Sequence, residues 1–243
     1  MSQMQPVPGR NRILASLPPE DAERLRPHLE HVPLALGQVL IERLEPIDHV
    51  YFIEAGISSD TAVTDDGEEM EVGIIGSEGL VGVAAVLGMD STSNRSFMQA
   101  PGMAQRIRVE ELRRAMDESP ALRRLLNRYV HAFLVQTSQS AGCNGRHTLD
   151  QRLARWLLMA QDRLGDDLPL THEFLSIMLG VRRSGVTVAL RALAQAGIVD
   201  QRRGHIRILD RGRLEALSCL CYRVVKAEFD RATDPDGMST ATA

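Results

Sequence analysis

The sequence predicts an α+β protein in which an N-terminal antiparallel β-roll (jelly roll) is followed by a long dimerisation helix and a C-terminal winged helix-turn-helix. Three observations support this order. Short β-like runs separated by glycine and proline turn signals fill residues 32–109. A long helical pattern follows Pro120, and two short helical patterns joined at Gly180 precede a basic hairpin pattern.

Both ends of the chain are expected to lie outside the folded units. Residues 1–10 are polar with two prolines and a glycine, and residues 233–243 form a polar tail. We expect both segments to be disordered, because neither carries the apolar side chains that a core needs. Residues 11–29 predict two short amphipathic helices that Pro18-Pro19 separates.

The β-roll is predicted from seven short runs of apolar and β-branched residues. Many short strands at such spacing are typical of a sandwich or jelly-roll barrel. We therefore assign residues 11–117 to a β-roll sensor domain. The runs are Gln38–Ile41, Val50–Ile53, Ser59–Val63, Glu71–Ile75, Leu80–Val83, Arg95–Gln99 and Ala104–Val109, with turn signals that include Gly56 and Pro101-Gly102.

A long helix is predicted from Pro120 to about Ala141. Its apolar residues occupy more than one flank, so one flank is expected to cover the β-roll and another to meet a second copy of the chain. A helix buried entirely within one chain is the alternative. Gly142 and Gly145 are expected to interrupt the helix and form a hinge, which completes a dimerisation unit at residues 118–145. The side chains assigned to the dimer contact are Leu122, Leu126, Tyr129, Val130 and Phe133.

Residues 146–220 predict a winged helix-turn-helix. After an amphipathic helix, Thr171 is a good N-cap for a helix that ends at Gly180, where a tight turn can follow. The helix Arg183–Gln195 comes next, with an apolar face at i, i+4 and i+7 from Val186. Its opposite stripe is the candidate surface for DNA bases and consists of Arg183, Ser184, Thr187, Val188 and Arg191.

A basic hairpin pattern comes directly after this helix. Alternating apolar and polar residues at 198–201 and 205–209 flank a glycine, and Arg202 and Arg203 lie at the predicted tip. A solvated charged turn would also explain these arginines, but not their place directly after the second helix. We therefore predict a wing, followed by a closing helix at 210–220.

Basic charge concentrates around this segment. The chain has a formal net charge of −4, yet residues 145–213 hold 12 basic and 7 acidic side chains. A local basic excess on an otherwise acidic chain is the electrostatic pattern expected of a DNA-binding module. No apolar span approaches the roughly 18 residues that a membrane crossing needs. Because a signal-peptide pattern is also lacking, we expect a cytoplasmic protein with no membrane partner.

The three cysteines, Cys143, Cys219 and Cys221, all lie in the C-terminal half of the chain. Cys219 and Cys221 lack two further ligands at the spacing of a zinc or iron–sulfur site. We therefore expect no metal site and free buried thiols, with a redox role as the alternative.

Several motifs occur in a characteristic order. Residues 51–56 are Tyr-Phe-Ile-Glu-Ala-Gly, residues 66–69 are a hairpin signal, Asp-Gly-Glu-Glu, and Leu170–Val199 holds the helix-turn-helix. Over about residues 11–220 this arrangement resembles the Crp/Fnr superfamily of bacterial transcription regulators. The resemblance implies a homodimer that binds double-stranded DNA at a near-palindromic site, with RNA polymerase as a further partner.

The resemblance also implies where a cyclic nucleotide would bind. In nucleotide-binding members a Gly-Glu pair grips the ribose and a later Arg-Ser or Arg-Thr pair binds the cyclic phosphate, which Gly82 and Arg95-Ser96 match. Val83 replaces the glutamate, ahead of Ala84, and would leave a ribose hydroxyl unsatisfied at a cost of about 1–3 kcal/mol. We therefore expect no tight binding of cyclic AMP. Arg95 as a surface strand residue is the alternative.

No cofactor is expected, and the effector is left open. The oxygen-sensing branch of the family holds an iron–sulfur centre with an N-terminal cysteine cluster, which this sequence lacks. Haem-sensing members use histidine or cysteine ligands, for which lone histidines such as His28, His31 and His49 give little support.

The same resemblance assigns DNA contacts. Arg183 matches a position that contacts guanine, whose O6 and N7 suit a bidentate guanidinium. Ser184 stands where nucleotide-binding members often have a glutamate, so the preferred DNA site is expected to differ from theirs. Val188 can meet a thymine methyl group. Phosphate contacts are assigned to Thr171, Arg202, Arg203 and His205, and Arg182 completes the DNA-binding set.

Together these features predict a sequence-specific DNA-binding transcription regulator, a homodimer whose β-roll senses an unidentified signal. No nucleophile–base pair or phosphate loop is evident, so no enzymatic activity is expected. Two alternatives stay open: an effector-binding regulatory subunit of an enzyme, and a nucleoid-type protein that binds DNA without sequence preference. Activation and repression are not distinguished.

Overall fold

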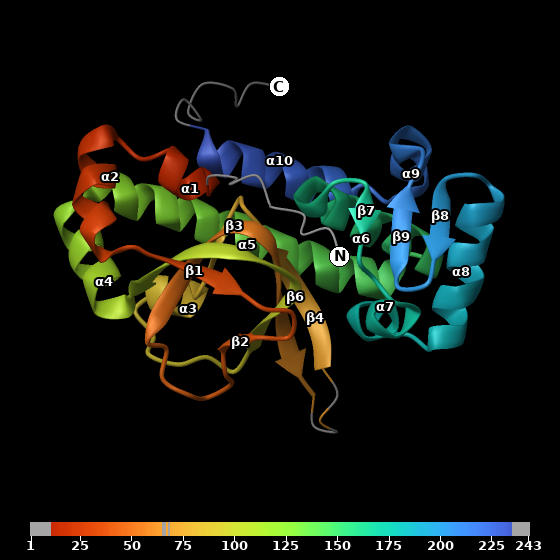
Figure 1. Ribbon diagram of the computed structural model, residues 1–243, viewed down its shortest axis with the longest axis horizontal. Helices are drawn as coiled ribbons and strands as arrows, with labels where there is room; N and C mark the ends of the chain where they lie inside the picture. Colours follow the sequence, from red (N-terminus) through yellow and green to blue (C-terminus); the bar gives the residue numbers. More distant parts are fainter. Residues whose placement is uncertain (1–10, 65–66, 68, 235–243) are drawn as a thin grey trace.

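The computed structural model describes residues 11–64, 67 and 69–234 of the 243-residue chain. A β-roll and a helix-turn-helix unit lie at opposite ends, with α5 (Pro120–Arg146) and α10 (Cys221–Thr233) extending between them (Figure 1). The predicted α+β fold class is confirmed. Residues 1–10 and 235–243, for which disorder is predicted, lie outside the described residues, as do Asp66 and Glu68 of the predicted hairpin signal.

The β-roll is a six-stranded antiparallel sheet with the order β1-β6-β3-β4, in which β2 also pairs with β6 and β5 with β3. Apolar side chains such as Phe52, Ile57 and Met98 fill its interior. Its strands are β1 (Glu30–Leu34), β2 (Val39–Ile41), β3 (His49–Val63), β4 (Glu69–Ile75), β5 (Leu80–Val81) and β6 (Arg95–Arg108). The preceding helices are α1 (Arg12–Ala15), α2 (Pro19–Leu25) and the 3₁₀ helix η1 (Arg26–His28).

Two predicted turns are irregularities inside long strands. The glycine signals at Gly56 and Gly102 predict turns, but β3 and β6 each continue through these positions as one strand. Gly56 has a φ of 88°, and the pairing register of β3 with β6 shifts on both sides of it. A Cβ on Gly102 would lie 1.8 Å from the carbonyl oxygen of Ala55. These glycines therefore allow a close backbone approach, which their sequence pattern does not distinguish from a turn.

The long helix α5 is longer than predicted. Ser119 caps it, because its hydroxyl accepts a hydrogen bond from the backbone N–H of Leu122 at 3.0 Å. The helix continues through Gly142 and Gly145, so the predicted break and hinge there are wrong. Glycine costs only about 1 kcal/mol in a helix interior, and burial of the intervening Cys143 stabilises this last turn. The helices between the roll and α5 are α3 (Val83–Val86) and α4 (Val109–Glu118).

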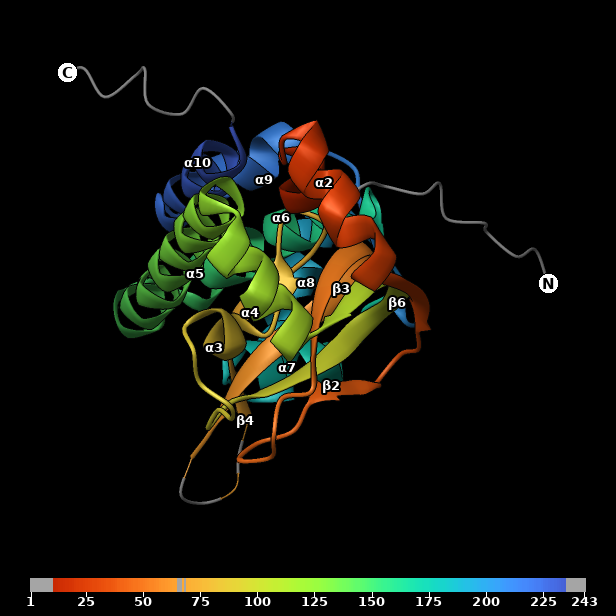
Figure 2. The same cartoon turned by 90° about the vertical axis from the view of Figure 1, so that its left-hand side faces the viewer.

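Sequence analysis missed α10, which lies alongside α5 (Figures 1 and 2). The rings of Phe229 on α10 and Tyr129 on α5 have centroids 6.1 Å apart. Thr233 ends α10 and accepts a hydrogen bond from Arg12 at 2.7 Å. The prediction that disorder begins at Thr233 is therefore wrong for that residue.

The C-terminal unit is a winged helix-turn-helix with a three-stranded sheet of order β7-β9-β8. A capping box between Thr148 and Gln151 starts α6. β8 and β9 form the predicted hairpin. The elements are α6 (Leu149–Leu164), β7 (Asp167–Leu168), α7 (His172–Leu179), α8 (Arg183–Gln195), β8 (Val199–Arg202), β9 (His205–Ile208) and α9 (Arg211–Leu217). Within the described residues, no helix is both long and apolar enough to cross a membrane.

Candidate nucleic-acid interface

Local contacts fix α7 and the turn that leads into α8. The hydroxyl of Thr171 accepts a hydrogen bond from the backbone N–H of Phe174 at 3.1 Å and caps α7. Gly180 ends that helix at a φ of 59°, in the left-handed region that favours glycine. Arg152 of α6 donates a hydrogen bond to the carbonyl oxygen of Leu179 and holds this turn against the unit. The start of α8 is thereby positioned by two other helices.

The two faces of α8 differ in burial. Val186, Leu190 and Leu193 are buried, as their spacing predicts. Val188 is 68% exposed although it is apolar. Arginine donors, a hydroxyl and an apolar side chain are the groups that contact base edges in a major groove. α8 lies at the outer edge of the molecule, away from the β-roll (Figure 1). Its exposed candidate DNA contacts are Arg183, Ser184, Val188 and Arg191.

Thr187, by contrast, is half-buried and bonded within the unit. Its hydroxyl donates to the carbonyl oxygen of Arg183 at 3.0 Å and lies 3.0 Å from Nδ1 of His172. Nε2 of His172 lies 3.3 Å from Oε1 of Gln201. His172 thus links α7 to α8 and β8. Sequence analysis missed it, because its partners are 15 and 29 positions away and no local pattern connects them.

The predicted phosphate-contacting groups lie on the surface. Arg202 forms an ion pair with Asp200 at 3.1 Å, and Arg183 one with Glu173 at 3.7 Å. Ion pairs between exposed side chains contribute little, so these arginines can exchange their partners for DNA. All four predicted phosphate contacts are exposed, namely Thr171, Arg202, Arg203 and His205, and so are Arg182 and Arg183, the latter assigned to a base.

The predicted effector residues separate into two groups. Arg95 forms ion pairs with Glu42 at 3.3 Å and Glu69 at 3.1 Å, as the surface-strand alternative expects. It is directed to these carboxylates and does not line the cavity where the prediction placed it. The other predicted residues, Gly82, Val83, Ala84 and Ser96, line a cavity of about 380 Å³ that also contacts α5.

Asp60 is the charged group of this cavity, and the sequence analysis did not single it out. Its carboxyl accepts hydrogen bonds from Asn94 at 2.8 Å and Ser96 at 2.9 Å. Burial raises the pKa of Asp60, although these two hydrogen bonds act in the opposite direction. With Arg95 turned away and a carboxyl facing in, the cavity is electrostatically unfavourable for an anion such as a cyclic phosphate.

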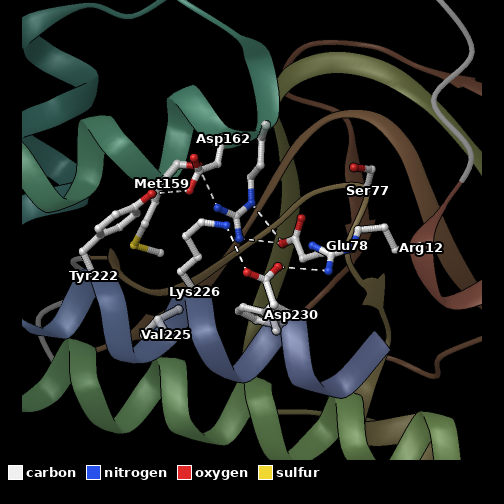
Figure 3. Close-up of a pocket in the computed structure, with 11 residues that line it drawn as sticks. Arg12, Ser77, Glu78, Met159, Asp162, Tyr222, Val225, Lys226 and Asp230 are labelled. Carbon is white, nitrogen blue, oxygen red and sulfur yellow. Dashed lines mark hydrogen bonds and ion pairs between the residues drawn. The ribbon is translucent and has the colours of Figure 1, made fainter. Parts of the chain in front are cut away.

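A second cavity, of about 190 Å³, lies where α6 and α10 meet the segment that begins α1 (Figure 3). Its charged side chains are paired, most of them with one another and Asp162 with Arg211. Asp230 forms ion pairs with Arg12 and Lys226, each at 3.0 Å, and Arg163 pairs with Glu78. Because these charges are already satisfied, we assign this cavity a structural role at the junction of the helices.

The five side chains assigned to the dimer contact are buried within one chain, so that assignment is wrong. For example, Tyr129 donates a hydrogen bond to the carbonyl oxygen of Leu80 at 2.8 Å. The β-roll covers one flank of α5 and α10 covers another. The buried residues are Leu122, Leu126, Tyr129, Val130 and Phe133. A different stripe of α5 is exposed at alternating spacings of four and three, and consists of Asn127, His131, Leu134, Ser138, Ala141 and Gly145.

The three cysteines are buried and lie together with a histidine. One ligand atom from each of Cys143, His147, Cys219 and Cys221 lies within 4.8 Å of the others. The expectation of no metal site assumed that Cys219 and Cys221 lack two further ligands. That premise is wrong, because it considered spacing along the chain only. In the folded chain Cys143 and His147 lie beside Cys219 and Cys221.

Two family models match the chain. One describes a cyclic nucleotide-binding domain and matches residues 31–119, and the other describes a Crp-like helix-turn-helix domain and matches residues 151–217. The chain belongs to the Crp/Fnr superfamily. It is a Crp/Fnr-type transcription regulator with a DNA-binding helix-turn-helix, and its family and fold are those of transcription regulators and not of enzymes.

Individual relatives agree with this assignment. The chain is 25% identical over 170 residues to a global nitrogen regulator of Nostoc, which covers 64% of this chain and 74% of the relative. It is also 25% identical over 196 residues to the transcriptional activator protein anr of Pseudomonas aeruginosa, covering 76% and 79%. The structure of FixK2 from Bradyrhizobium japonicum has the same fold, with a TM-score of 0.69 at 18% identity, covering 79% of this chain and 98% of that one.

Proposed function

We propose that this Crp/Fnr regulator binds a near-palindromic DNA site as a homodimer, with α8 in the major groove and a signal sensed in the β-roll. The exposed face of α8 is the observation that carries the proposal. Arg183, Val188 and Arg191 lie free of the protein core on this face, beside a wing that bears Arg202 and Arg203. Such a surface supplies both base contacts and phosphate contacts.

Arg183 has the most favourable position for a base contact. It is the first residue of α8, and the N-terminal part of a recognition helix is the part that meets base edges. Its ion pair with Glu173 joins two exposed groups, so little free energy is lost when the guanidinium turns to guanine O6 and N7. Val188 then packs on a thymine methyl group further along the groove.

The exposed stripe of α5 is the proposed dimer contact. Its spacing of four and three residues is that of the a and d positions of a coiled coil. Leu134, 54% exposed, is its large apolar member. Ser138 and Gly145 are small, which lets two copies of the helix approach closely toward the DNA-binding end. A two-fold axis along α5 would present two α8 helices to successive major grooves, about 34 Å apart.

The signal is proposed to act through the cavity of Asp60. Leu134 and Thr137 of α5 line this cavity, so an occupant would contact the same helix that forms the dimer. Because Asp60 and Ser96 offer hydrogen bonds and the cavity has no cation among its lining residues, the favoured ligand is neutral or cationic. Cyclic AMP, an anion, is disfavoured.

The remaining alternatives fit these features less well. A nucleoid-type protein that binds phosphates only would gain nothing from an apolar residue such as Val188 on its DNA-facing helix. A regulatory subunit of an enzyme would not need a basic wing. Contact with RNA polymerase is part of the proposal, as expected of a regulator that acts at promoters.

Genome-wide mapping of bound sites with the full chain tests this function. The expected result is a limited set of sites that share a near-palindromic sequence. A binding signal spread over the genome in proportion to the amount of DNA, with no sequence shared among the bound sites, would contradict the proposed function. The variant Arg183→Ala is the control, since it should bind the same sites more weakly and relax the shared sequence at the base pair that Arg183 contacts.

A further inference from the structure

The side chains of Cys143, His147, Cys219 and Cys221 meet at the junction of α5 and α10. The Sγ atoms of Cys143 and Cys219 lie 3.5 Å apart, and Sγ of Cys221 lies 3.7 Å from Nδ1 of His147. All four ligand atoms lie within 4.8 Å of one another. The three cysteines are buried and His147 is half-buried. The chain has no other cysteine.

These separations match the edges of a coordination tetrahedron. Zinc–sulfur distances of about 2.3 Å and zinc–nitrogen distances of about 2.0–2.1 Å place tetrahedral ligands roughly 3.5–3.8 Å apart. The separation of 3.5 Å between Cys143 and Cys219 and that of 3.7 Å between Cys221 and His147 lie in that range. A set of three thiolates and one imidazole is a common ligand set of closed, structural zinc sites.

We propose that Cys143, His147, Cys219 and Cys221 bind a single divalent cation of the zinc class. The site is built where the C-terminal end of α5 meets the start of α10. Cys143 lies in the last turn of α5 and His147 follows that helix in an extended conformation. Cys219 and Cys221 lie just before and at the first residue of α10. A helix N-terminus favours a thiolate, which suits Cys221 as a ligand.

A buried arginine beside the site supplies a matching charge. Three thiolates, a neutral imidazole and a divalent cation carry a net charge of −1. Arg155 of α6 is 6% exposed and within electrostatic reach of Cys143 and Cys221. It donates a hydrogen bond to the hydroxyl of Ser140 at 3.0 Å, but its Nε has no hydrogen-bond partner among the described residues. A buried guanidinium of this kind is stabilised by a nearby anionic centre.

The bound ion would connect segments that are distant in the chain. It joins the end of α5, which leads directly into the DNA-binding unit, to the start of α10, which packs back along α5. Metal binding free energy is folding free energy when the ligands come together only in the folded chain. The site therefore holds α10 in place. This inference concerns metal binding alone and does not depend on the proposed DNA site.

The test uses the full chain, reduced and stripped with a chelator under anaerobic conditions, and titrated with cobalt(II) and then zinc. The expected result is one equivalent of cobalt with the intense visible bands of a tetrahedral thiolate complex, displaced by one equivalent of zinc. Competition with a chromophoric chelator should give a zinc Kd in the nanomolar range or below. Zinc should also raise the thermal unfolding temperature.

Variants assign the ligands. Cys219→Ser and His147→Ala should lose stoichiometric zinc binding, whereas His31→Ala, a histidine of the β-roll, should keep it. If the ligand variants fail to fold, the wild-type cobalt spectrum and the zinc-dependent rise in unfolding temperature still decide the question.

The proposal is overturned if cobalt gives only the weak bands of an octahedral complex, or if fully reduced protein with three titratable thiols binds no zinc. It is equally overturned if the chain takes up several irons with sulfide, or if Cys143 and Cys219 are found as a disulfide in the native protein.

Discussion

The indole Nε1 of Trp156 donates a hydrogen bond to Oε1 of Glu71 at 2.7 Å and thereby joins α6 of the DNA-binding unit to β4 of the β-roll. The other carboxyl oxygen accepts hydrogen bonds from Ser59 at 2.7 Å and Gln99 at 3.1 Å. Burial nevertheless raises the pKa of Glu71 to about 7, because no solvent stabilises the charge. The contact between the sensor and the DNA-binding unit therefore includes a carboxyl group that changes charge near neutral pH.

Glu71→Gln should remove a pH dependence of stability. The folded protein holds the Glu71 proton more tightly than the unfolded chain, so stability falls as pH rises from the ordinary glutamate pKa near 4.5 to about 7. Above that range the wild type should be less stable than Glu71→Gln by an amount on the order of 3 kcal/mol. Urea unfolding between pH 5 and pH 8 measures the difference, with exposed Glu45→Gln as control. Parallel pH profiles for wild type and Glu71→Gln would show that the carboxyl keeps one protonation state.

Arg203→Ala should weaken binding to all DNA sequences by a similar factor. Arg203 is exposed at the tip of the wing, where it is assigned to a phosphate. The slope of log affinity against log salt concentration should fall by about 0.9 for each phosphate that the variant no longer neutralises, and a homodimer has two such arginines. Fluorescence anisotropy over a salt series gives this slope. Arg114→Ala on α4, far from the wing in the chain, should leave it unchanged, and an unchanged slope for Arg203→Ala would remove this residue from the phosphate-binding set.

Leu134→Glu should convert the proposed homodimer to a monomer. A carboxylate at the centre of the exposed α5 stripe would face its own copy across the two-fold axis, where like charges repel. Sedimentation velocity on wild type and variant measures the change. Leu36→Glu replaces a similarly exposed leucine of the β-roll and should stay dimeric. A wild-type chain that sediments as a monomer, or a dimeric Leu134→Glu, would reject the stripe as the interface.

Cyclic AMP and cyclic GMP should each bind with a Kd of about 1 mM or weaker. Val83 lacks the carboxylate that would accept the ribose hydroxyl, Asp60 faces the cavity, and Arg95 is paired with Glu42 and Glu69. Isothermal titration calorimetry with the full chain is the measurement. Micromolar binding of either nucleotide would contradict this description of the cavity.

The DNA-binding end could be predicted from the sequence because its signals are local. The cap at Thr171, the left-handed Gly180 and the apolar spacing from Val186 lie within a few residues of the groups they organise. The wing could also be predicted from the sequence, since alternating apolar and polar residues flank a single glycine. The exposure of Val188 follows directly from the helical period.

The errors concern relationships between distant segments. Apolar residues of α5 such as Leu126 and Val130 suit a dimer contact equally well, and only the position of α10 shows that they are used within the chain. Gly56 is typical of a turn until its partner strand is known. The clustering of Cys143 and His147 with Cys219 and Cys221 depends on α10 returning to α5, which spacing along the chain does not reveal.

The most direct test of sequence-specific DNA binding is the ratio of affinities for a selected near-palindromic site and for random DNA of equal length, at one salt concentration. The wild-type chain should prefer the selected site by a factor of about 10³ or more. Arg183→Ala should weaken binding by about 1–3 kcal/mol at the selected site and by little on random DNA. A wild-type ratio near one, or an equal weakening on both DNAs for Arg183→Ala, would contradict the account.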